Sequence, residues 1–441
     1  MKTKRTIAII LLAGLVLAIC YSLYFRITPT VDADAYDAIA TNLVNGNGYV
    51  ENAELPVVED SAIGRVGPGY QFFLFIIYKI FGHHFEIVWI IQALLHTFSA
   101  GLLFLISRKI FSEGGQWIGI AAAALYVFFI DVLQMSAMIM TESLFLFLSV
   151  LSIYFFVNFF QNATTKNSIY LGLSIALCIL TRPTALLLLG VFVVFAISKR
   201  YFLQAVILVA CFVAVVGPWT LRNYLVFDRF IMTTAAGGYD IWVGNNLEAN
   251  GELDPSPQIT AYLEKYGVES ADEEGIKKVK EFALNHPVQF IKLQLIKTSI
   301  YFSFARPSAF WFHLSGASKM LTIVASSLFS FIVFIFGFAG IWLLWKSKEK
   351  IYRWLLLLTL TAPAAVIPII VETRYRFPIY PLLSVFGAYA MYEIYKNWKL
   401  NPDKDALYLK IKAVAVSALI IIGNTAFDVW RNIEVVKDKL G

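Results

Sequence analysis

Charged residues are scarce in this chain of 441 residues. Asp, Glu, Lys and Arg together make up 15% of the sequence, whereas apolar residues make up 59%. Soluble domains carry roughly 25% charged and 45–50% apolar residues. The composition excludes a disordered chain and argues against a soluble multidomain enzyme, because so much apolar surface cannot be hidden in water-soluble globules. It predicts an integral membrane protein that crosses the bilayer many times.

Cysteine and histidine are also rare, with 3 and 5 residues. Cys20, Cys178 and Cys211 lie inside apolar runs and show neither metal-ligand nor disulfide spacing, so we expect them to be small core residues. His83 and His84 have no acidic neighbour at ligand spacing, and we expect no metal site there. The net charge of +6 is too small to predict a nucleic-acid partner.

Long apolar runs predict about eleven membrane spans, since a transmembrane helix needs roughly 20 apolar residues. The predicted spans are residues 7–25, 87–111, 117–134, 136–160, 169–181, 183–197, 202–219, 321–345, 354–371, 378–395 and 413–427. We expect the first span to be retained and not cleaved as a signal peptide, because no small-residue cleavage site closes it. Pro183 separates the fifth span from the sixth, because proline disfavours helix at the residue before it.

Lys and Arg are distributed unevenly between the two ends of these spans. With the N-terminus in the cytoplasm, most of them fall at cytoplasmic ends, and the short outer turns carry only Arg182, Arg374 and Arg376. The positive-inside rule therefore predicts a cytoplasmic N-terminus. The same topology puts two long loops, residues 26–86 and 220–320, on the outer face.

The second of these loops contains a weaker apolar run at residues 288–305. It includes Lys292 and Lys297, so we expect it to lie at the membrane interface or to pack outside the bundle. The whole chain, residues 1–441, is then predicted to form a single membrane domain.

Apolar residues recur at helical spacing just after the first span, at Tyr36, Ile39, Ala40 and Leu43. This pattern predicts a short amphipathic helix on the membrane surface, ended by Gly46. Asp32 or Asp34 would lie at its N-terminal end. Such a carboxylate either caps the helix or is held at the membrane boundary, where it can accept a proton from a hydroxyl.

Arg65 precedes a turn at Gly67-Pro68-Gly69, and a short apolar helix follows to about residue 81. The helix is short for a span, so we expect it to be re-entrant or interfacial. The Arg65 side chain then either anchors the helix at the level of the lipid headgroups or binds a lipid phosphate, whose geometry a guanidinium matches.

Short motifs follow one another along the chain in a characteristic order. They are Asp32 four residues before Tyr36, Gly46-Asn47-Gly48-Tyr49, Arg65 with Pro68-Gly69-Tyr70, Gln92, Thr141-Glu142, Thr181-Arg182-Pro183, Gly217-Pro218-Trp219, Arg222-Asn223-Tyr224, Gly244-Asn245-Asn246, His286-Pro287 and Arg374-Tyr375-Arg376-Phe377-Pro378. Together they resemble the protein O-mannosyltransferase and aminoarabinose transferase superfamily, membrane glycosyltransferases of the GT-C fold. The chain departs from protein O-mannosyltransferases at the first motif, where it has Asp32-Ala33-Asp34 in place of Asp-Glu.

The resemblance implies an all-α GT-C bundle with amphipathic juxtamembrane helices and two long outer loops. It also implies inverting transfer of a sugar from undecaprenyl or dolichyl phosphate to a hydroxyl of a glycan, lipid or protein. The lipid-linked sugar would be a donor substrate, and no other cofactor is expected. The expected place of reaction is the outer face of a bacterial inner membrane.

The resemblance also assigns expected roles to individual residues. The position matching the family's catalytic base is Asp32, with Asp34 as the second choice. The expected ligands of the donor phosphate are Arg65, Arg374 and Arg376, followed by Arg182 and Arg222. The sugar or acceptor site would include Tyr36, Tyr70, Glu142, Asn245, Asn246 and Tyr375. Each assignment has a structural alternative. The arginines can be snorkelling anchors, Glu142 can be the partner in a structural ion pair, and the asparagines can be ordinary turn residues.

A transporter or flippase of polyprenyl-linked sugars is the alternative function. Such a protein would carry its polar groups near the bilayer midplane on broken helices. The charges in this sequence gather instead at the predicted outer ends of the spans, which favours an enzyme.

Overall fold

The computed structural model describes residues 2–306 and 313–433. These residues form helices and no strand, as the sequence predicts. The bundle contains α1 (Lys2–Phe25), α4 (Phe85–Ile110), α5 (Gly115–Val127), α7 (Thr141–Gln161), α8 (Thr165–Thr181), α9 (Leu186–Ser198), α10 (Phe202–Phe227), α14 (Gly316–Trp345), α15 (Lys350–Val366), α16 (Tyr380–Tyr395) and α17 (Lys404–Arg431).

Each predicted span overlaps one of these helices. By length and composition, 6 of the described helices can cross a membrane: α1, α4, α7, α10, α14 and α17. The expected number of spans therefore stays a prediction.

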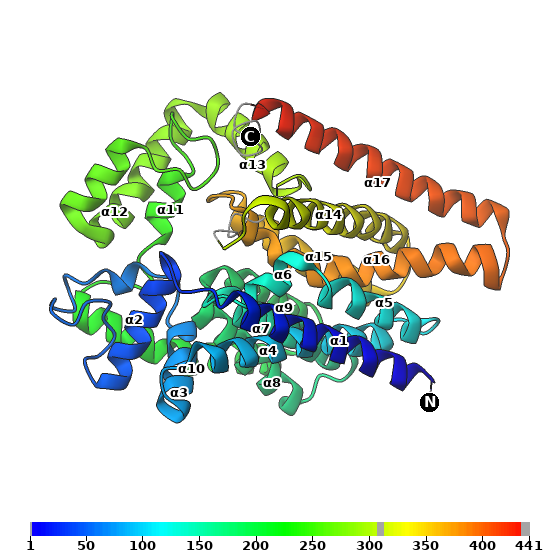
Figure 1. Cartoon of the computed structure of the whole chain (residues 1–441), viewed down its shortest axis with the longest axis horizontal. Helices are drawn as coiled ribbons and strands as arrows, with labels where there is room; N and C mark the ends of the chain where they lie inside the picture. The colour runs from blue at the N-terminus through cyan, green and yellow to red at the C-terminus, as the bar shows by residue number, and fades with distance from the viewer. Residues whose placement is uncertain (1, 307–312, 434–441) are drawn as a thin grey trace.

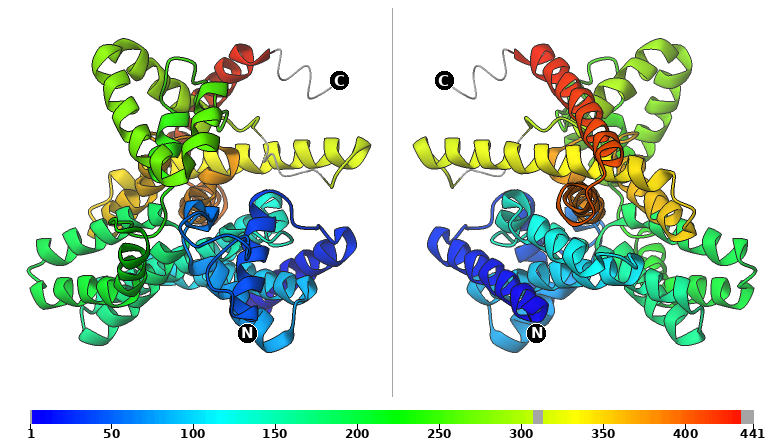
Figure 2. Two further views of the ribbon diagram at one scale, coloured as in Figure 1. Left: turned by 90° about the vertical axis from the view of Figure 1, so that its left-hand side faces the viewer. Right: turned by 90° about the vertical axis from the view of Figure 1, so that its right-hand side faces the viewer.

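The two long segments between spans are mostly helical. Residues 26–86 contain α2 (Asp32–Asn45), the 3-10 turn η1 (Ser61–Gly64) and α3 (Gly69–Phe81). The described part of residues 220–320 contains α11 (Gly237–Val243), α12 (Pro257–Asn285) and α13 (Pro287–Tyr301). The helices α2, α11 and α12 gather at one end of the bundle, on the left in Figure 1 and facing the viewer in the left panel of Figure 2.

The predicted span at residues 117–134 is broken, and this expectation was wrong. Helix α5 ends at Val127, a short α6 (Ile130–Met135) follows, and α7 begins only at Thr141. Polar side chains of α4 bind the carbonyls that the break releases. The Nε2 of His96 donates to the Val127 carbonyl at 3.0 Å, and Gln92 Nε2 donates to the carbonyls of Ser136 at 3.1 Å and Met138 at 2.7 Å. These three carbonyls of the irregular backbone are thus paired without water, which favours such a break inside a membrane protein.

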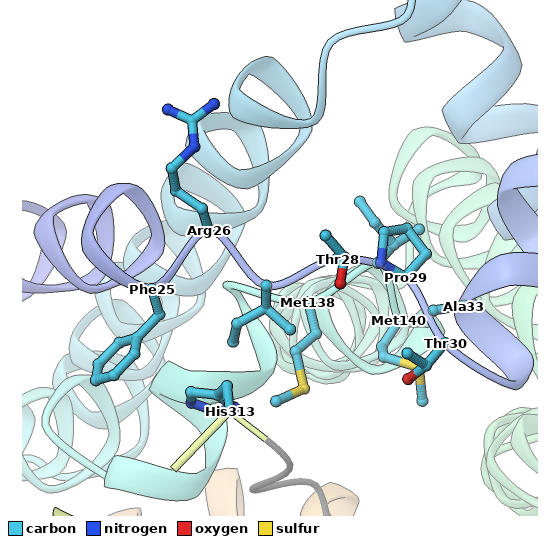
Figure 3. A pocket seen from close by; sticks show the side chains of 11 residues that line it. Phe25, Arg26, Thr28, Pro29, Thr30, Ala33, Met138, Met140 and His313 are labelled. Carbon is cyan, nitrogen blue, oxygen red and sulfur yellow. The ribbon is translucent and has the colours of Figure 1, made fainter.

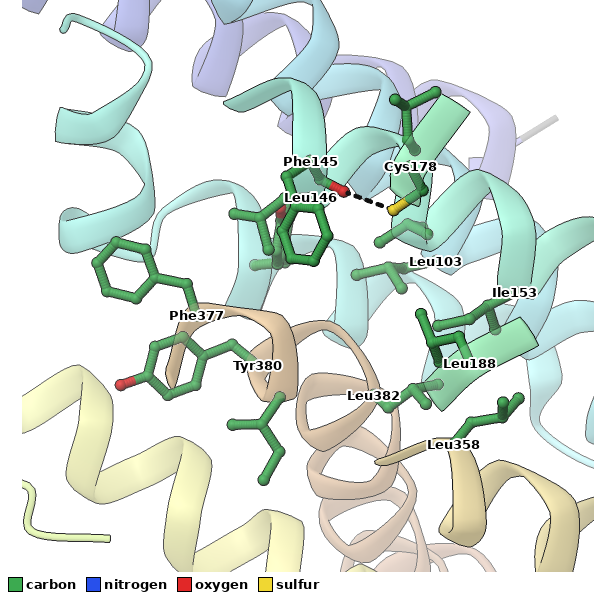
Figure 4. Close-up of a cluster of buried hydrophobic side chains, with 14 of the residues drawn as sticks. Leu103, Phe145, Leu146, Ile153, Cys178, Leu188, Leu358, Phe377, Tyr380 and Leu382 are labelled. Carbon is green, nitrogen blue, oxygen red and sulfur yellow. Dashed lines mark hydrogen bonds between the residues drawn. The ribbon is translucent and has the colours of Figure 1, made fainter. Parts of the chain in front are cut away.

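The helices enclose one large apolar core (Figure 4). Cys178 is buried in it, and its thiol donates to the Phe145 carbonyl at 3.8 Å. Cys20 is exposed on α1 and Cys211 is partly exposed, so the expectation of three core cysteines was right only for Cys178. All three are free thiols.

Gln92 tests how much the broken span depends on side chains. Gln92→Leu leaves two buried carbonyls and the Tyr70 hydroxyl without their partner, and each unsatisfied group costs about 1–3 kcal/mol. We expect Gln92→Leu to lower the free energy of unfolding in detergent by at least about 2 kcal/mol. Gln161→Leu removes an exposed hydrogen bond to the Lys109 carbonyl and should cost less than about 1 kcal/mol. Equal losses in the two variants would contradict this account.

Candidate active site

Asp32 is the first residue of α2 and lies among charged groups from three elements. Its Oδ2 accepts a hydrogen bond from Arg374 Nη2 at 3.0 Å, and its Oδ1 is 3.7 Å from Arg65 Nη1. Arg374 belongs to the 3-10 helix η3 (Thr373–Ile379), which precedes α16. The Asp32 side chain is 27% exposed, so an incoming hydroxyl can reach it.

The capping alternative for Asp32 and Asp34 does not hold. The residue at the cap position is Val31, and no side chain caps α2. Val31 has a φ of 54°, which is unfavourable for a β-branched residue. Asp34 is exposed and takes part in none of the ion pairs found within residues 2–306 and 313–433.

Arg65 is held in place by a carboxylate that sequence reasoning missed. Its Nε and Nη2 donate to the two oxygens of Glu51 at 2.9 and 2.8 Å. The glycines after Arg65 bring α3 against the end of α8, because a Cβ on Gly67 would lie 2.2 Å from the Leu180 carbonyl oxygen. The Gly-Pro-Gly turn therefore brings Arg65 beside the segment that carries Arg182.

Arg374 and Arg182 share a second group of partners. Arg182 donates to Glu142 at 2.6 Å and to Thr141 Oγ1 at 2.8 Å. Glu142 also lies 3.9 Å from Arg374 Nε. The ring of Tyr375 is 5.5 Å from the Arg182 guanidinium carbon and 5.3 Å from that of Arg374, both cation–π contacts. These contacts join the start of α7, the end of α8 and η3.

Glu372 also binds Arg374, accepting from its Nε at 2.6 Å. Sequence reasoning missed this residue too, although it lies two positions before Arg374 in the last motif. That spacing alone does not distinguish an ion-pair partner from an ordinary loop carboxylate.

Tyr36 and Tyr70 lie beneath these charges. Both side chains are buried, and their rings meet edge-on with centroids 5.7 Å apart. Burial, followed by the neighbouring Asp32 carboxylate, raises the pKa of Tyr36. Tyr70 donates its hydroxyl hydrogen to Gln92 at 2.8 Å, so it connects the site to the broken span.

Two of the expected phosphate ligands lie elsewhere. Arg376 is fully buried, and its guanidinium donates to the backbone carbonyls of Ser303 and Arg306 at 2.5 and 2.6 Å. Arg222 lies over the ring of Trp219, 5.0 Å from its centroid, and 5.9 Å from that of Tyr49. The structure therefore does not bring Arg376 or Arg222 to the Asp32 carboxylate.

The two asparagines expected in the sugar site are occupied by contacts within the chain. Asn245 is fully buried, donates to the carbonyls of Pro368 and Ile369, and accepts from Lys297 Nζ at 2.7 Å. Asn246 donates to the Trp242 carbonyl at 3.0 Å. These contacts favour the structural alternative for both residues.

A cavity of about 220 Å³ lies beside the start of α2. It is lined by residues 25–30 and by Ala33, Met138–Met140 and His313. In Figure 3 the Arg26 side chain points away from Met138 and His313. The Arg26 guanidinium forms an ion pair with Glu86. The cavity is mainly apolar. Two of the residues that line it, Thr30 and Ala33, lie within two positions of Asp32 in the sequence.

A family model described as dolichyl-phosphate-mannose-protein mannosyltransferase matches residues 65–220. Among the solved structures that resemble the chain, the following two match over 95% of its length. One is the Archaeoglobus fulgidus oligosaccharyltransferase, with 14% identity and a TM-score of 0.51. The other is ArnT from Cupriavidus metallidurans, with 11% identity and a TM-score of 0.51. The chain has the GT-C fold.

This finding confirms the fold predicted from the motifs and, with the apolar helices, an integral membrane protein. The chain spans 56% of the archaeal oligosaccharyltransferase and 71% of ArnT. None of the curated proteins compared with the chain is a match. Within the described ranges, no group of three or more His, Cys, Asp or Glu side chains is arranged to hold a metal ion.

The buried Arg182–Glu142 pair gives a prediction about stability. Arg182→Leu removes the nearest cation from Glu142, whose side chain is 2% exposed, and leaves it only Arg374 at 3.9 Å. Breaking a buried ion pair in this way costs about 3–5 kcal/mol. The double variant Arg182→Leu/Glu142→Leu should lose less than Arg182→Leu alone, because it leaves no buried charge of the pair. Denaturant unfolding in detergent of both single variants and the double variant measures this coupling. Additive losses would show that the two residues do not depend on each other.

Proposed function

We propose that the protein is an inverting membrane glycosyltransferase that moves a sugar from a polyprenyl phosphate to a hydroxyl acceptor. The observation that carries the proposal is the position of the Asp32 carboxylate, 3.0 Å from Arg374 and 3.7 Å from Arg65. A partly exposed carboxylate beside two guanidiniums supplies a proton acceptor and an anion-binding site within one group of residues.

The comparisons support the donor class. The ArnT structure contains undecaprenyl phosphate, and the matched family model is named for dolichyl-phosphate-mannose. The proposed donor for this chain is accordingly an undecaprenyl- or dolichyl-phosphate sugar. The acceptor is a hydroxyl group of a glycan, a lipid or a protein.

Arg65 and Arg374 are the proposed ligands of the donor phosphate. In the free protein their charges are balanced by Glu51, Asp32 and Glu372. A donor phosphate competes with Asp32 for the two guanidiniums, because both anions match the same donors. Donor binding therefore frees the Asp32 carboxylate at the moment when a base is required.

Asp32 is the proposed general base. As the acceptor oxygen forms a bond to the sugar C1, its proton passes to Asp32. The bond between C1 and the phosphate oxygen breaks on the opposite face, and the electron pair remains on the phosphate. The configuration at C1 is thereby inverted. Fixed guanidiniums stabilise the charge that develops on the leaving group, and this stabilisation is large in a poorly hydrated site.

Arg182, Glu142 and Tyr375 have supporting roles in this proposal. Arg182 is engaged by Glu142 and Thr141, so it acts mainly by holding Glu142 and the Tyr375 ring in place next to Arg374. Tyr36 and Tyr70 form the buried floor below Asp32. The proposed location is the outer face of a bacterial inner membrane, because the positive-inside rule puts both long segments on that side.

Asp32→Asn tests the base. Loss of a general base typically slows a reaction by about 10²- to 10⁴-fold, so we expect sugar transfer from a panel of undecaprenyl-phosphate sugars to fall within this range. Asp34→Asn is the matched control, since Asp34 is exposed two residues away on the same helix, and it should keep near-normal activity. Normal transfer by Asp32→Asn together with loss in Asp34→Asn would assign the base to Asp34.

Arg374→Gln tests the phosphate site separately. Hydrogen bonds to charged groups contribute about 1.5–3 kcal/mol, so we expect undecaprenyl phosphate to bind Arg374→Gln about tenfold or more weakly, whereas Asp32→Asn keeps or improves this binding. The measurement is a binding titration of undecaprenyl phosphate with purified protein. Unchanged affinity in Arg374→Gln would exclude Arg374 as a phosphate ligand. Movement of the lipid-linked sugar across vesicles without transfer would favour the flippase alternative.

A further inference from the structure

The break between α6 and α7 leaves Met138–Met140 outside any helix. Irregular backbone at membrane depth is tolerated where it is buried in protein or lines a cavity. These three residues are among those that line the cavity beside α2. The Gln92 amide, which donates to the Met138 carbonyl at 2.7 Å, therefore holds one wall of this cavity in place.

The cavity is joined to the candidate active site through two segments of the chain. Ala33, in its lining, follows Asp32 in the first turn of α2. Met140, in another wall, lies two residues before Glu142. Glu142 Oε1 is 3.9 Å from Arg374 Nε, and Arg374 Nη2 is 3.0 Å from Asp32 Oδ2. Figure 3 shows Ala33 and Met140 at one end of the cavity, which is accordingly the end nearest the charged residues.

The other end of the cavity is formed by Phe25, the last residue of α1, and by His313 (Figure 3). Their rings meet with centroids 4.9 Å apart, and the Tyr21 hydroxyl lies 2.7 Å from His313 Nε2. The last turn of α1 also exposes Leu23 and Tyr24, which are 41% and 81% accessible. Because α1 can cross a membrane by its length and composition, the cavity runs from the start of α2 to the apolar surface of a membrane helix.

The lining determines the chemistry of the occupant. It is mainly apolar and includes Met138 and Met140, whose flexible side chains adapt to irregular apolar shapes. Arg26 points away from it and pairs with Glu86. A sugar or a phosphate would lose hydrogen bonds to water in this space, whereas a hydrocarbon chain would not. The volume of about 220 Å³ is smaller than the roughly 300–1,000 Å³ of pockets for whole small ligands, so the cavity fits a segment of a chain.

The proposed inversion assigns the two substrates to opposite faces of the sugar C1. The acceptor hydroxyl approaches together with the base, Asp32, and the phosphate leaves from the other face with its polyprenyl chain. The described lining of the cavity includes Thr30 and Ala33, close to Asp32 in the sequence, and neither of the proposed phosphate ligands Arg65 and Arg374. The cavity therefore lies on the side of the acceptor.

Resting on the proposed glycosyl transfer, we propose that the cavity beside α2 binds the hydrocarbon chain of a lipid acceptor. The chain enters from the bilayer past the end of α1, and the hydroxyl group of the lipid reaches Asp32 at the end marked by Ala33 and Met140. The acceptor is then an amphiphile that stays in the membrane. The matched family model is named for transfer to protein, so this acceptor class differs from the one in that name.

Photo-cross-linking of the full chain in phosphatidylcholine nanodiscs tests the cavity directly. The probe is dodecanol that carries a diazirine on its chain, and mass spectrometry identifies the cross-linked residues. We expect cross-links at Met138–Met140. Cross-links confined to the outer surface of α1, at Leu23 and Tyr24, would show that the alcohol only dissolves in the bilayer and would overturn the proposal.

Thr28→Trp should close the cavity, because Thr28 lines it and is itself exposed, so the larger ring displaces no core residue. Burial of one methylene favours binding about fourfold, so losing the space for two should lower cross-linking at Met138–Met140 about tenfold or more. Thr165→Trp, at an exposed threonine that begins α8, is the matched control and should behave as the wild type. Undiminished cross-linking in Thr28→Trp would contradict the proposal. Displacement of the probe by undecaprenyl phosphate would assign the cavity to the donor chain and overturn the acceptor role.

The class of the product tests the acceptor itself. Membranes that contain the chain are incubated with undecaprenyl-phosphate sugars labelled in the sugar. We expect label in a product that dissolves in chloroform and methanol and survives mild acid, which cleaves the sugar–phosphate bond of the donor but not a glycoside. Thr28→Trp should form this product about tenfold more slowly and bind undecaprenyl phosphate normally. Label in protein or in a water-soluble glycan would overturn the proposal.

The two experiments separate this inference from the proposed function. Absence of any sugar transfer by the wild type, together with the expected cross-links at Met138–Met140, would refute the proposed function and the acceptor role with it, but not the binding of a hydrocarbon chain. Sugar transfer to a lipid without cross-links in the cavity would support the proposed function and refute the cavity as the site of the acceptor chain.

Discussion

The contact between Asp32 and Arg374 joins the first long segment to the start of α16, and the rest of the site is arranged around it. A partly buried ion pair is stable only if its remaining donors and acceptors are also paired. Glu372 and Glu142 supply these partners for Arg374, and Arg65 does so for Asp32. Carboxylates and guanidiniums therefore alternate in the site. An anionic ligand of Arg65 or Arg374 has to replace one of the carboxylates that these arginines bind.

The arrangement depends on how η3 is held. Arg376 donates to the carbonyls of Ser303 and Arg306, in the segment that follows α13. Residues two apart on a 3-10 helix, with three residues per turn, point about 120° apart, so Arg374 and Arg376 leave η3 on different sides and bind different partners. One arginine of the motif contacts the active-site carboxylate, and the other attaches η3 to the second long segment.

The second long segment is attached to the bundle at several further points. Lys297 and Asn245 together bind the carbonyls of Pro368 and Ile369, in the loop that leads to η3. On the other side, the Asn424 amide of α17 donates to the Ser299 carbonyl at 3.0 Å. Through Asn245, which follows α11, and Lys297 on α13, these buried polar contacts attach the second long segment to the loop before η3.

The sequence by itself determined the class of the protein and the positions of its helices, because apolar composition and periodicity report burial directly. The order of motifs also indicated Asp32, Arg65 and Arg374. The break after Val127 was not visible, because the side chains that stabilise it, His96 and Gln92, lie on another helix. Only the tertiary structure decided which arginines meet Asp32, since a charge-to-charge contact between distant segments leaves no local pattern in the chain.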